Sequence, residues 1–265
     1  MKNLSGKCAI VLAAGGSIGS AVAKEFAANG AEVFVCGRTK AKLDVLVAEI
    51  ATAGGRAHSA IVDVENEPAV DRYIADIAKQ TDHIDVIFNA MGPRVSEYGN
   101  GKLAVDLTVA EYMIPLETLV RSQFISSRAA ARQMLKQRSG VIVFVTGSPA
   151  RGHVQGATAI GTAFGAIETF MENLAVELSP SGVRVVCLRT TTNMDSRTMK
   201  EMMALMAQQL GRPEEEMAKM MAGMNFLKTK ASVADTAHGI AYLASDQARM
   251  MTGTVVNASA GAGPD

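Results

Sequence analysis

Short runs of consecutive apolar residues alternate along this chain with longer segments in which apolar residues repeat at helical spacing. The runs cover residues 8–13, 31–37, 57–64, 85–92, 140–148, 183–189 and 252–259. Strands that are apolar throughout are typical of a sheet buried on both faces, and helices between successive strands are typical of right-handed crossovers. The alternation therefore predicts an α/β fold: a doubly wound parallel sheet of about seven strands with helices on both faces.

The segments between these runs predict the helices and the domain organisation. Helical spacing is found near residues 18–30, 39–53, 67–80, 108–137, 160–179 and 232–244. Gly30 ends the first segment and Gly54-Gly55 follow the second, as expected where helices end. The 265 residues contain no repeat and no low-complexity linker. A single domain spanning residues 1–265 is therefore expected.

Residues 194–224 depart from this rhythm because they hold nine of the sixteen methionines. The segment predicts two short helices separated by Gly211-Arg212-Pro213. Flexible thioether side chains suit an adaptable apolar surface. Two interpretations stay open: helix packing or a subunit contact, and a mobile lid over an apolar substrate.

The charge balance bears on possible partners. Lys+Arg and Asp+Glu both number 26, so the formal net charge is zero and gives no electrostatic footprint for nucleic acid or an anionic membrane. The apolar runs are far shorter than the roughly 20 residues of a membrane-spanning helix. The chain passes directly into a strand-like run without a separate signal-peptide region, so a cytoplasmic protein is expected.

Cysteine and histidine usage gives no sign of a metal site. Cys8, Cys36 and Cys187 each lie inside an apolar run. They are expected to be small buried hydrophobic residues in a reducing compartment. The four histidines, His58, His83, His153 and His238, are scattered without ligand spacing.

A glycine-rich turn follows the first predicted strand in residues 11–23, VLAAGGSIGSAVA. Glycines there let the backbone approach a pyrophosphate, which then lies against the free N–H groups and positive end of the following helix. The candidates are Gly15, Gly16 and Gly19, and Ser17 can add a hydroxyl. The position between strand and helix is the context that this interaction requires. The turn therefore predicts a dinucleotide site.

This turn resembles that of the short-chain dehydrogenase/reductase family, whose pattern Thr-Gly-x-x-x-Gly-Ile-Gly lines up with residues 12–19. The chain matches at Ile18 and Gly19 but has Ala13 and Ser17 where the family has glycines. Gly15 and Gly16 are expected to compensate, with a shifted phosphate path.

Three further segments carry the same resemblance. Asp63-Val64 is similar to the family's adenine contact, Asn89-Ala90-Met91 to its Asn-Ala-Gly element beside the cofactor, and residues 252–261 to its last strand. The resemblance covers roughly residues 5–190 and 230–261. It implies a Rossmann-type single domain that binds a nicotinamide dinucleotide.

The end of the second predicted strand bears on the choice of cofactor. An acidic residue near Gly37 would bond both ribose hydroxyls and repel a 2′-phosphate. The chain instead has Gly37 followed by Arg38 and Thr39. The forked guanidinium of Arg38 favours binding of a 2′-phosphate and can also stack on the adenine ring. The prediction is NADP(H).

The resemblance also implies a reductase site built from a Ser and a Tyr-x-x-x-Lys pair, in which Lys lowers the pKa of the proton-donating Tyr. Ser148 matches the serine. Counting back from Ala166 along the next predicted helix places the Tyr position at Gly161 and the Lys position at Gly165. The sequence has no tyrosine between Tyr112 and Tyr242, and no lysine between Lys136 and Lys200. A divergent member without this pair is predicted.

Several side chains are candidates to replace the missing pair. His153 can titrate near neutrality, and Tyr98 lies in a glycine-flanked loop that could fold over the site. Arg94 and Arg151 could stabilise an oxyanion. Together with Ser148, His153 and Tyr98 form the predicted catalytic set. The family's Pro-Gly pair after the sixth strand is replaced by Thr190-Thr191.

Three functions remain open from the sequence. The first is an NADP(H)-dependent oxidoreductase acting on a small, partly apolar carbonyl or activated alkene with a non-standard proton donor. The second is a non-redox enzyme, such as an isomerase, cyclase or lyase, on the same scaffold. The third is a catalytically inactive NADP(H)-binding protein. The resemblance further implies a homodimer or homotetramer formed through helices 108–137 and 160–179.

Overall fold

We describe the protein from a computed structural model, which covers residues 3–151, 154–223 and 225–263. In this part of the chain a sheet of seven parallel strands has the order β3-β2-β1-β4-β5-β6-β7. The strands are β1 (Cys8–Leu12), β2 (Glu32–Gly37), β3 (Arg56–Ile61), β4 (Val86–Asn89), β5 (Gly140–Gly147), β6 (Val183–Thr190) and β7 (Thr254–Ala258). The predicted doubly wound Rossmann-type sheet is confirmed.

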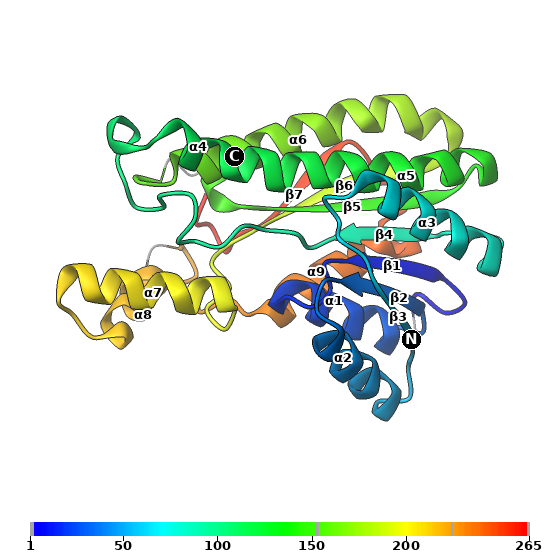
Figure 1. Ribbon diagram of the computed structural model, residues 1–265, viewed down its shortest axis with the longest axis horizontal. Coiled ribbons are helices and arrows are strands. Elements are labelled where there is room, and N and C mark those ends of the chain that lie inside the picture. The colour runs from blue at the N-terminus through cyan, green and yellow to red at the C-terminus, as the bar shows by residue number, and fades with distance from the viewer. Residues whose placement is uncertain (1–2, 152–153, 224, 264–265) are drawn as a thin grey trace.

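Helices cover both faces of the sheet (Figure 1). One face carries α1 (Ser17–Ala28), α2 (Lys40–Thr52) and α9 (Val233–Ala244); the other carries α3 (Glu67–Thr81), α5 (Arg121–Gln137) and α6 (Thr158–Leu178). Two separate apolar layers result, because successive residues of each inner strand point to opposite faces. In β5, for example, Ile142 and Phe144 belong to the layer under α6, whereas Val143 belongs to the layer under α1 and α9.

The helix predicted over residues 108–137 is continuous but not uniform. Its first part, α4 (Val109–Pro115), begins with a capping box between Thr108 and Glu111. A π-helical turn (Leu116–Val120) then joins α4 to α5. Pro115 lies at the junction, and a proline inside a helix removes one backbone donor. π-turns of this kind are frequent at functional sites.

The methionine-rich segment forms two short helices, as predicted: α7 (Arg197–Leu210) and α8 (Glu214–Gly223). We call this pair the methionine hairpin. It extends from the left side of the molecule in Figure 1, beyond the end of β6. Gly211 ends α7 in a left-handed conformation with φ +62°. Met199, Met203 and Met217 are buried, so part of the hairpin has an apolar core.

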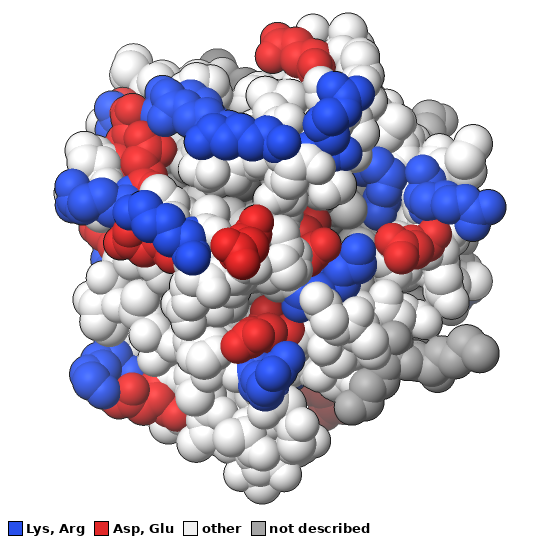
Figure 2. All heavy atoms as spheres, turned by 90° about the vertical axis from the view of Figure 1, so that its right-hand side faces the viewer, with Lys and Arg blue, Asp and Glu red and all other residues white. Residues whose placement is uncertain are grey.

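The surface carries mixed charge. Figure 2 shows the end of the molecule away from the methionine hairpin, where Lys and Arg are interspersed with Asp and Glu. Among the helices of the described residues, none combines the length and hydropathy that a membrane span needs. The three cysteines are buried free thiols, and burial raises the pKa of Cys36 and Cys187 to about 12. Ordinary thiolate chemistry is therefore suppressed at these two positions.

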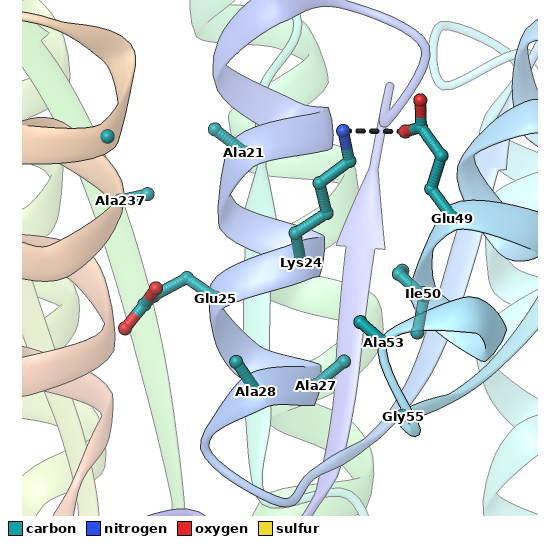
Figure 3. A pocket seen from close by; sticks show the side chains of 11 residues that line it. Ala21, Lys24, Glu25, Ala27, Ala28, Glu49, Ile50, Ala53, Gly55 and Ala237 are labelled. Atoms are coloured by element: carbon teal, nitrogen blue, oxygen red, sulfur yellow. Dashed lines mark ion pairs between the residues drawn. The ribbon is translucent and has the colours of Figure 1, made fainter.

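A shallow hollow lies between α1, α2 and α9, the helices that cover one face of the sheet (Figure 3). Its floor is mostly alanine, and Lys24 and Glu49 form an ion pair of 2.6 Å on one side. The residues that line it include none of the predicted site residues. The candidate site lies instead at the carboxyl ends of the strands, where ligands of open α/β sheets bind.

Candidate functional site

The glycine-rich turn leads from β1 into an uncapped helix. Helix α1 begins at Ser17, and its N-cap residue, Gly16, supplies no side-chain hydrogen bond. The first amide N–H groups of a helix have no partner within the helix and form the positive end of its dipole. The turn therefore presents the N–H groups that an anionic pyrophosphate would bind.

The glycines of the turn differ in whether a side chain would fit at their positions. A β-carbon at Gly19 would lie 2.8 Å from Ala14 Cα and 3.0 Å from Ala90 Cβ, so only glycine fits there. At Gly15 and Gly16 the nearest atoms would be 3.6 and 3.8 Å away, which is ordinary contact. Gly19 thus lets α1 approach the ends of β1 and β4, while Gly15 and Gly16 leave bare backbone for a ligand.

Ala13 occupies a backbone conformation that suits glycine. Its φ is +54°, in the left-handed region, and this is the position where the family pattern has glycine. Ala13→Gly is expected to raise the free energy of unfolding by about 0.5–1 kcal/mol, because glycine removes the steric cost of the β-carbon. Urea denaturation monitored by circular dichroism would measure the change.

The neighbouring Ala14 provides the control for this prediction. It is buried and is not among the residues with positive φ. Ala14→Gly should therefore destabilise the fold through the added freedom of the unfolded chain. A loss of stability in Ala13→Gly as large as that in Ala14→Gly would contradict the argument.

The Ser17 hydroxyl connects the turn to the methionine hairpin. Ser17 Oγ accepts a hydrogen bond of 3.0 Å from the backbone N–H of Arg197, the first residue of α7. The hydroxyl predicted to face a phosphate thus holds the start of the hairpin. The neighbouring Ile18 packs against the apolar layer under α1.

The end of β2 lies next to the glycine turn. The N–H of Ala14 donates to Cys36 O at 2.8 Å, and this bond brings Arg38 and Thr39 close to the turn. Arg38 is exposed, and no side-chain hydrogen bond from Thr39 caps α2. Sequence reasoning missed Lys42, whose Cβ would be 3.6 Å from a β-carbon at Gly15. Only the turn of α2 brings Lys42 beside the glycines, which the linear pattern does not reveal.

The predicted adenine contact lies at the end of β3. Asp63 is exposed, and its Oδ1 accepts a hydrogen bond of 3.1 Å from the N–H of Glu65. Val64 is 3% exposed and belongs to the apolar layer under α3. Asp63 is therefore available to a ligand, whereas Val64 has a packing role.

Asn89 ties β4 to α5. Its Nδ2 donates to Ser122 O and Ser126 Oγ, each at 3.1 Å, and its Oδ1 accepts from the N–H of Met91 at 2.9 Å. Gln123 Nε2 donates to the Asn89 carbonyl at 2.9 Å. Asn89 is 1% exposed, so its polar atoms serve the protein itself. Through the bond to the Met91 N–H it shapes the chain directly after β4.

Ser148 lies where β5 ends. It is 9% exposed, and its hydroxyl forms no hydrogen bond with another described residue. A short 3₁₀ turn (Ser148–Ala150) follows, closed by a bond of 3.1 Å from the Arg151 N–H to the Ser148 carbonyl. The geometry leaves the Ser148 hydroxyl free to bond a substrate.

The start of α6 lies beside Ser148. A β-carbon at Gly161 would lie 2.9 Å from the Pro149 carbonyl, and one at Gly165 would meet no atom within 4 Å. Phe164 lies between these two glycines in the sequence. Its ring would be 2.9 Å from a β-carbon built at Gly147. The helix thus places an aromatic ring against Gly147, the last residue of β5.

The two other predicted proton donors have different outcomes. Tyr98 is 6% exposed and packs in the apolar layer under α5 and α6. Burial raises the pKa of Tyr98 to about 12, which makes its phenol a weaker acid than usual. His153 lies outside the described residues.

A buried charged cluster lies one turn of α6 beyond Phe164. Both carboxylate oxygens of Glu168 accept from the Arg189 guanidinium at 2.9 Å, and Thr146 Oγ1 donates to Oε1 at 2.8 Å. Arg151 Nε is 3.4 Å from Oε2. Glu168 is fully buried and Arg189 is 2% exposed. Sequence reasoning missed this cluster, because its members are distant in the sequence.

The fold and the glycine turn together define a Rossmann-type α/β protein. A family model described as enoyl-(acyl carrier protein) reductase matches residues 12–262. The chain belongs to the short-chain dehydrogenase/reductase family.

Two curated relatives illustrate this membership. The short-chain reductase protein NovJ of Streptomyces niveus is 36% identical over 177 residues, which are 67% of this chain and 65% of NovJ. This chain thus spans less than two thirds of that relative's length. The 7alpha-hydroxysteroid dehydrogenase of Escherichia coli strain K12 is 30% identical over 183 residues, 69% of each chain.

Solved structures show the same fold. A variant of actinorhodin polyketide ketoreductase with NADPH has a TM-score of 0.88 at 21% identity, covering 98% of both chains. NAD⁺-bound xylitol dehydrogenase has a TM-score of 0.87 at 24% identity, covering 96% of this chain and 98% of that one.

Proposed function

We propose that this protein is an NADP(H)-dependent oxidoreductase of the short-chain type. The observation that carries the proposal is the uncapped start of α1 at the bare glycine turn, with Arg38 and Lys42 beside it. Neither cation is paired with a carboxylate among the described residues. Two unpaired cations next to a pyrophosphate site favour a cofactor with an additional 2′-phosphate. The related ketoreductase structure contains NADPH, and the xylitol dehydrogenase structure contains NAD⁺.

The proposed substrate is a small, partly apolar carbonyl compound or activated alkene. The methionine hairpin supports this proposal, because it is fixed to the site at two points. Its start bonds Ser17, and Asn100 Nδ2 lies 3.3 Å from Met202 Sδ, which joins the hairpin to the loop after β4. Flexible methionine side chains on such a lid suit an apolar substrate.

The proposed site works without the Tyr-x-x-x-Lys pair. Gly161 and Gly165 supply no acid, and the Phe164 ring between them lies against Gly147. NADPH would supply the hydride when bound. Ser148 would orient the acceptor oxygen or alkene substituent, with solvent as the source of the proton. Aligned hydride transfer without a strong acid is consistent with a slow or specialised reductase.

Calorimetric titration with NADPH and NADH tests the cofactor proposal. We expect NADPH to bind at least about tenfold more tightly, because only NADPH carries the phosphate that Arg38 and Lys42 can bind. Oxidation of NADPH is then followed by absorbance against a panel of aldehydes, ketones and activated alkenes. Failure of both cofactors to bind at millimolar concentration would refute the proposal.

Ser148→Ala is expected to lower turnover by about 100-fold while leaving the NADPH dissociation constant unchanged. A single hydroxyl that orients a developing oxyanion has an effect of this size, and the Ser148 side chain forms no hydrogen bond with another described residue that its loss would break. Steady-state kinetics of NADPH oxidation would measure it. Ser59→Ala, an exposed serine on the edge strand β3, is the matched control. Unchanged turnover in Ser148→Ala would remove Ser148 from the mechanism.

A second candidate function is NADP(H) binding without turnover, alone or in a non-redox enzyme. Phe164 favours it, because an aromatic ring lies against Gly147 beside Ser148, and Gly161 and Gly165 supply no acid there. Tight NADPH binding with no hydride transfer to any acceptor would support this candidate over the first.

We further propose that the protein works in the cytoplasm as a homodimer or homotetramer paired through α5 and α6. Apolar side chains on these helices support the proposal: Phe124 is 47% exposed and Val176 is 78% exposed. Such exposure is typical of a surface covered by a second subunit. Sedimentation velocity would distinguish the two oligomers from a monomer.

A further inference from the structure

We propose that Arg151 binds an oxyanion group of the substrate beside Ser148, so that the preferred substrates carry a carboxylate or phosphate. This inference deepens the proposed function and rests on the same site. The juxtaposition that carries it is an exposed guanidinium fixed by a fully buried carboxylate at the carboxyl end of β5.

Arg151 is held next to Ser148 by the backbone. The Arg151 N–H bonds the Ser148 carbonyl at 3.1 Å and closes the 3₁₀ turn after β5. The Arg151 side chain is 55% exposed, although its Nε lies 3.4 Å from the fully buried Glu168 carboxylate. One edge of the guanidinium is therefore fixed, and other N–H donors remain available to a ligand.

The Glu168 carboxylate is shared between several donors. Arg189 contacts both oxygens at 2.9 Å, and Thr146 Oγ1 donates to one of them at 2.8 Å. Glu168 is the only carboxylate within ion-pair distance of Arg151 among the described residues. The Arg151 guanidinium thus has one shared counter-ion and exposed N–H donors, and a planar fork of this kind binds a second anion well.

The side chains around Arg151 favour an apolar group in the rest of the ligand. Phe164 covers Gly147 on one side of Ser148, and the methionine hairpin adds flexible apolar side chains. A molecule that places an oxyanion on Arg151 and its carbonyl at Ser148 would leave its apolar part against these groups. Keto acids with a short alkyl chain have this chemistry.

The test measures the binding of three probes to the full-length protein by calorimetry, with and without NADP⁺. The probes are 5-oxohexanoate, its methyl ester and inorganic phosphate. We expect 5-oxohexanoate to bind at least about tenfold more tightly than the ester, and Arg151→Gln to abolish this difference without changing NADPH affinity. Arg151→Lys should retain part of the preference, because the charge remains but the fork is lost.

Arg72→Gln is the matched control, since Arg72 is exposed on α3 away from β5. Equal binding of the acid and the ester, or the same preference in Arg151→Gln and Arg72→Gln, overturns the inference. So does the absence of binding of all three probes. Tight phosphate binding that depends on Arg151, with weak binding of the keto acid, supports the oxyanion site and assigns it to phosphorylated substrates. Loss of NADPH binding in the unmodified protein would instead refute the proposed function, and the cofactor-free titrations separate the two.

Discussion

Glu168→Gln is expected to lower the free energy of unfolding by about 3–5 kcal/mol, a large part of the total stability of a typical domain. The reason is that Glu168 is fully buried and its two oxygens contact the Arg189 guanidinium at 2.9 Å. Removing the Glu168 charge breaks a bidentate ion pair with a guanidinium that is 2% exposed, and breaking a buried ion pair is strongly destabilising. Urea denaturation followed by circular dichroism would measure the loss.

A control variant makes this expectation specific. Glu177→Gln changes an exposed carboxylate on the same helix and should alter stability by less than about 0.5 kcal/mol. If Glu168→Gln were as stable as Glu177→Gln, the pair would not contribute as described.

Arg38→Ala is expected to weaken NADPH binding by about 10- to 100-fold and NADH binding by less than about threefold. The guanidinium lies at the end of β2 beside the glycine turn and has no carboxylate partner among the described residues, so its charge is available to a 2′-phosphate. Charge-assisted hydrogen bonds of this kind contribute about 1.5–3 kcal/mol. Calorimetric titration of both cofactors would measure the two ratios.

Lys40→Ala provides the control for Arg38. Lys40 is exposed two residues further along, but its Nζ pairs with the Asp44 carboxylate at 2.8–2.9 Å. Its charge is therefore already engaged, and its loss should change NADPH affinity little. An equal loss for NADPH and NADH in Arg38→Ala would show that the residue does not distinguish the cofactors. Arg38→Ala combined with Lys42→Ala should weaken NADPH further, if both cations contribute.

The sheet could be predicted well because burial leaves a strong signal in sequence. Inner strands such as β1 and β5 are covered on both faces and are apolar almost throughout. The edge strand β3 departs from this rule, with many of its residues exposed, because it has one neighbour only. The sequence also predicts the two short helices of the methionine hairpin, since Gly211 and Pro213 interrupt the helical pattern.

The catalytic end of the site could be predicted less well, because side-chain direction on a helix changes by about 100° per residue. Counting along the sequence directs attention to Gly161 and Gly165, yet the residue between them that reaches Gly147 is Phe164. The cluster of Glu168, Arg189 and Thr146 joins residues 21 and 22 positions apart in sequence. No local spacing rule indicates such a contact.

The hydrogen bond between Ser17 and Arg197 has a consequence for ligand affinity. This bond of 3.0 Å joins the first residue of the methionine hairpin to the glycine turn, where the proposed cofactor phosphates would bind. A ligand that shifts this bond changes the position of the hairpin, and by thermodynamic reciprocity a molecule held under the hairpin changes the affinity for the cofactor by the same factor. In the proposed function, the affinities for nucleotide and substrate are thereby coupled through a single hydroxyl.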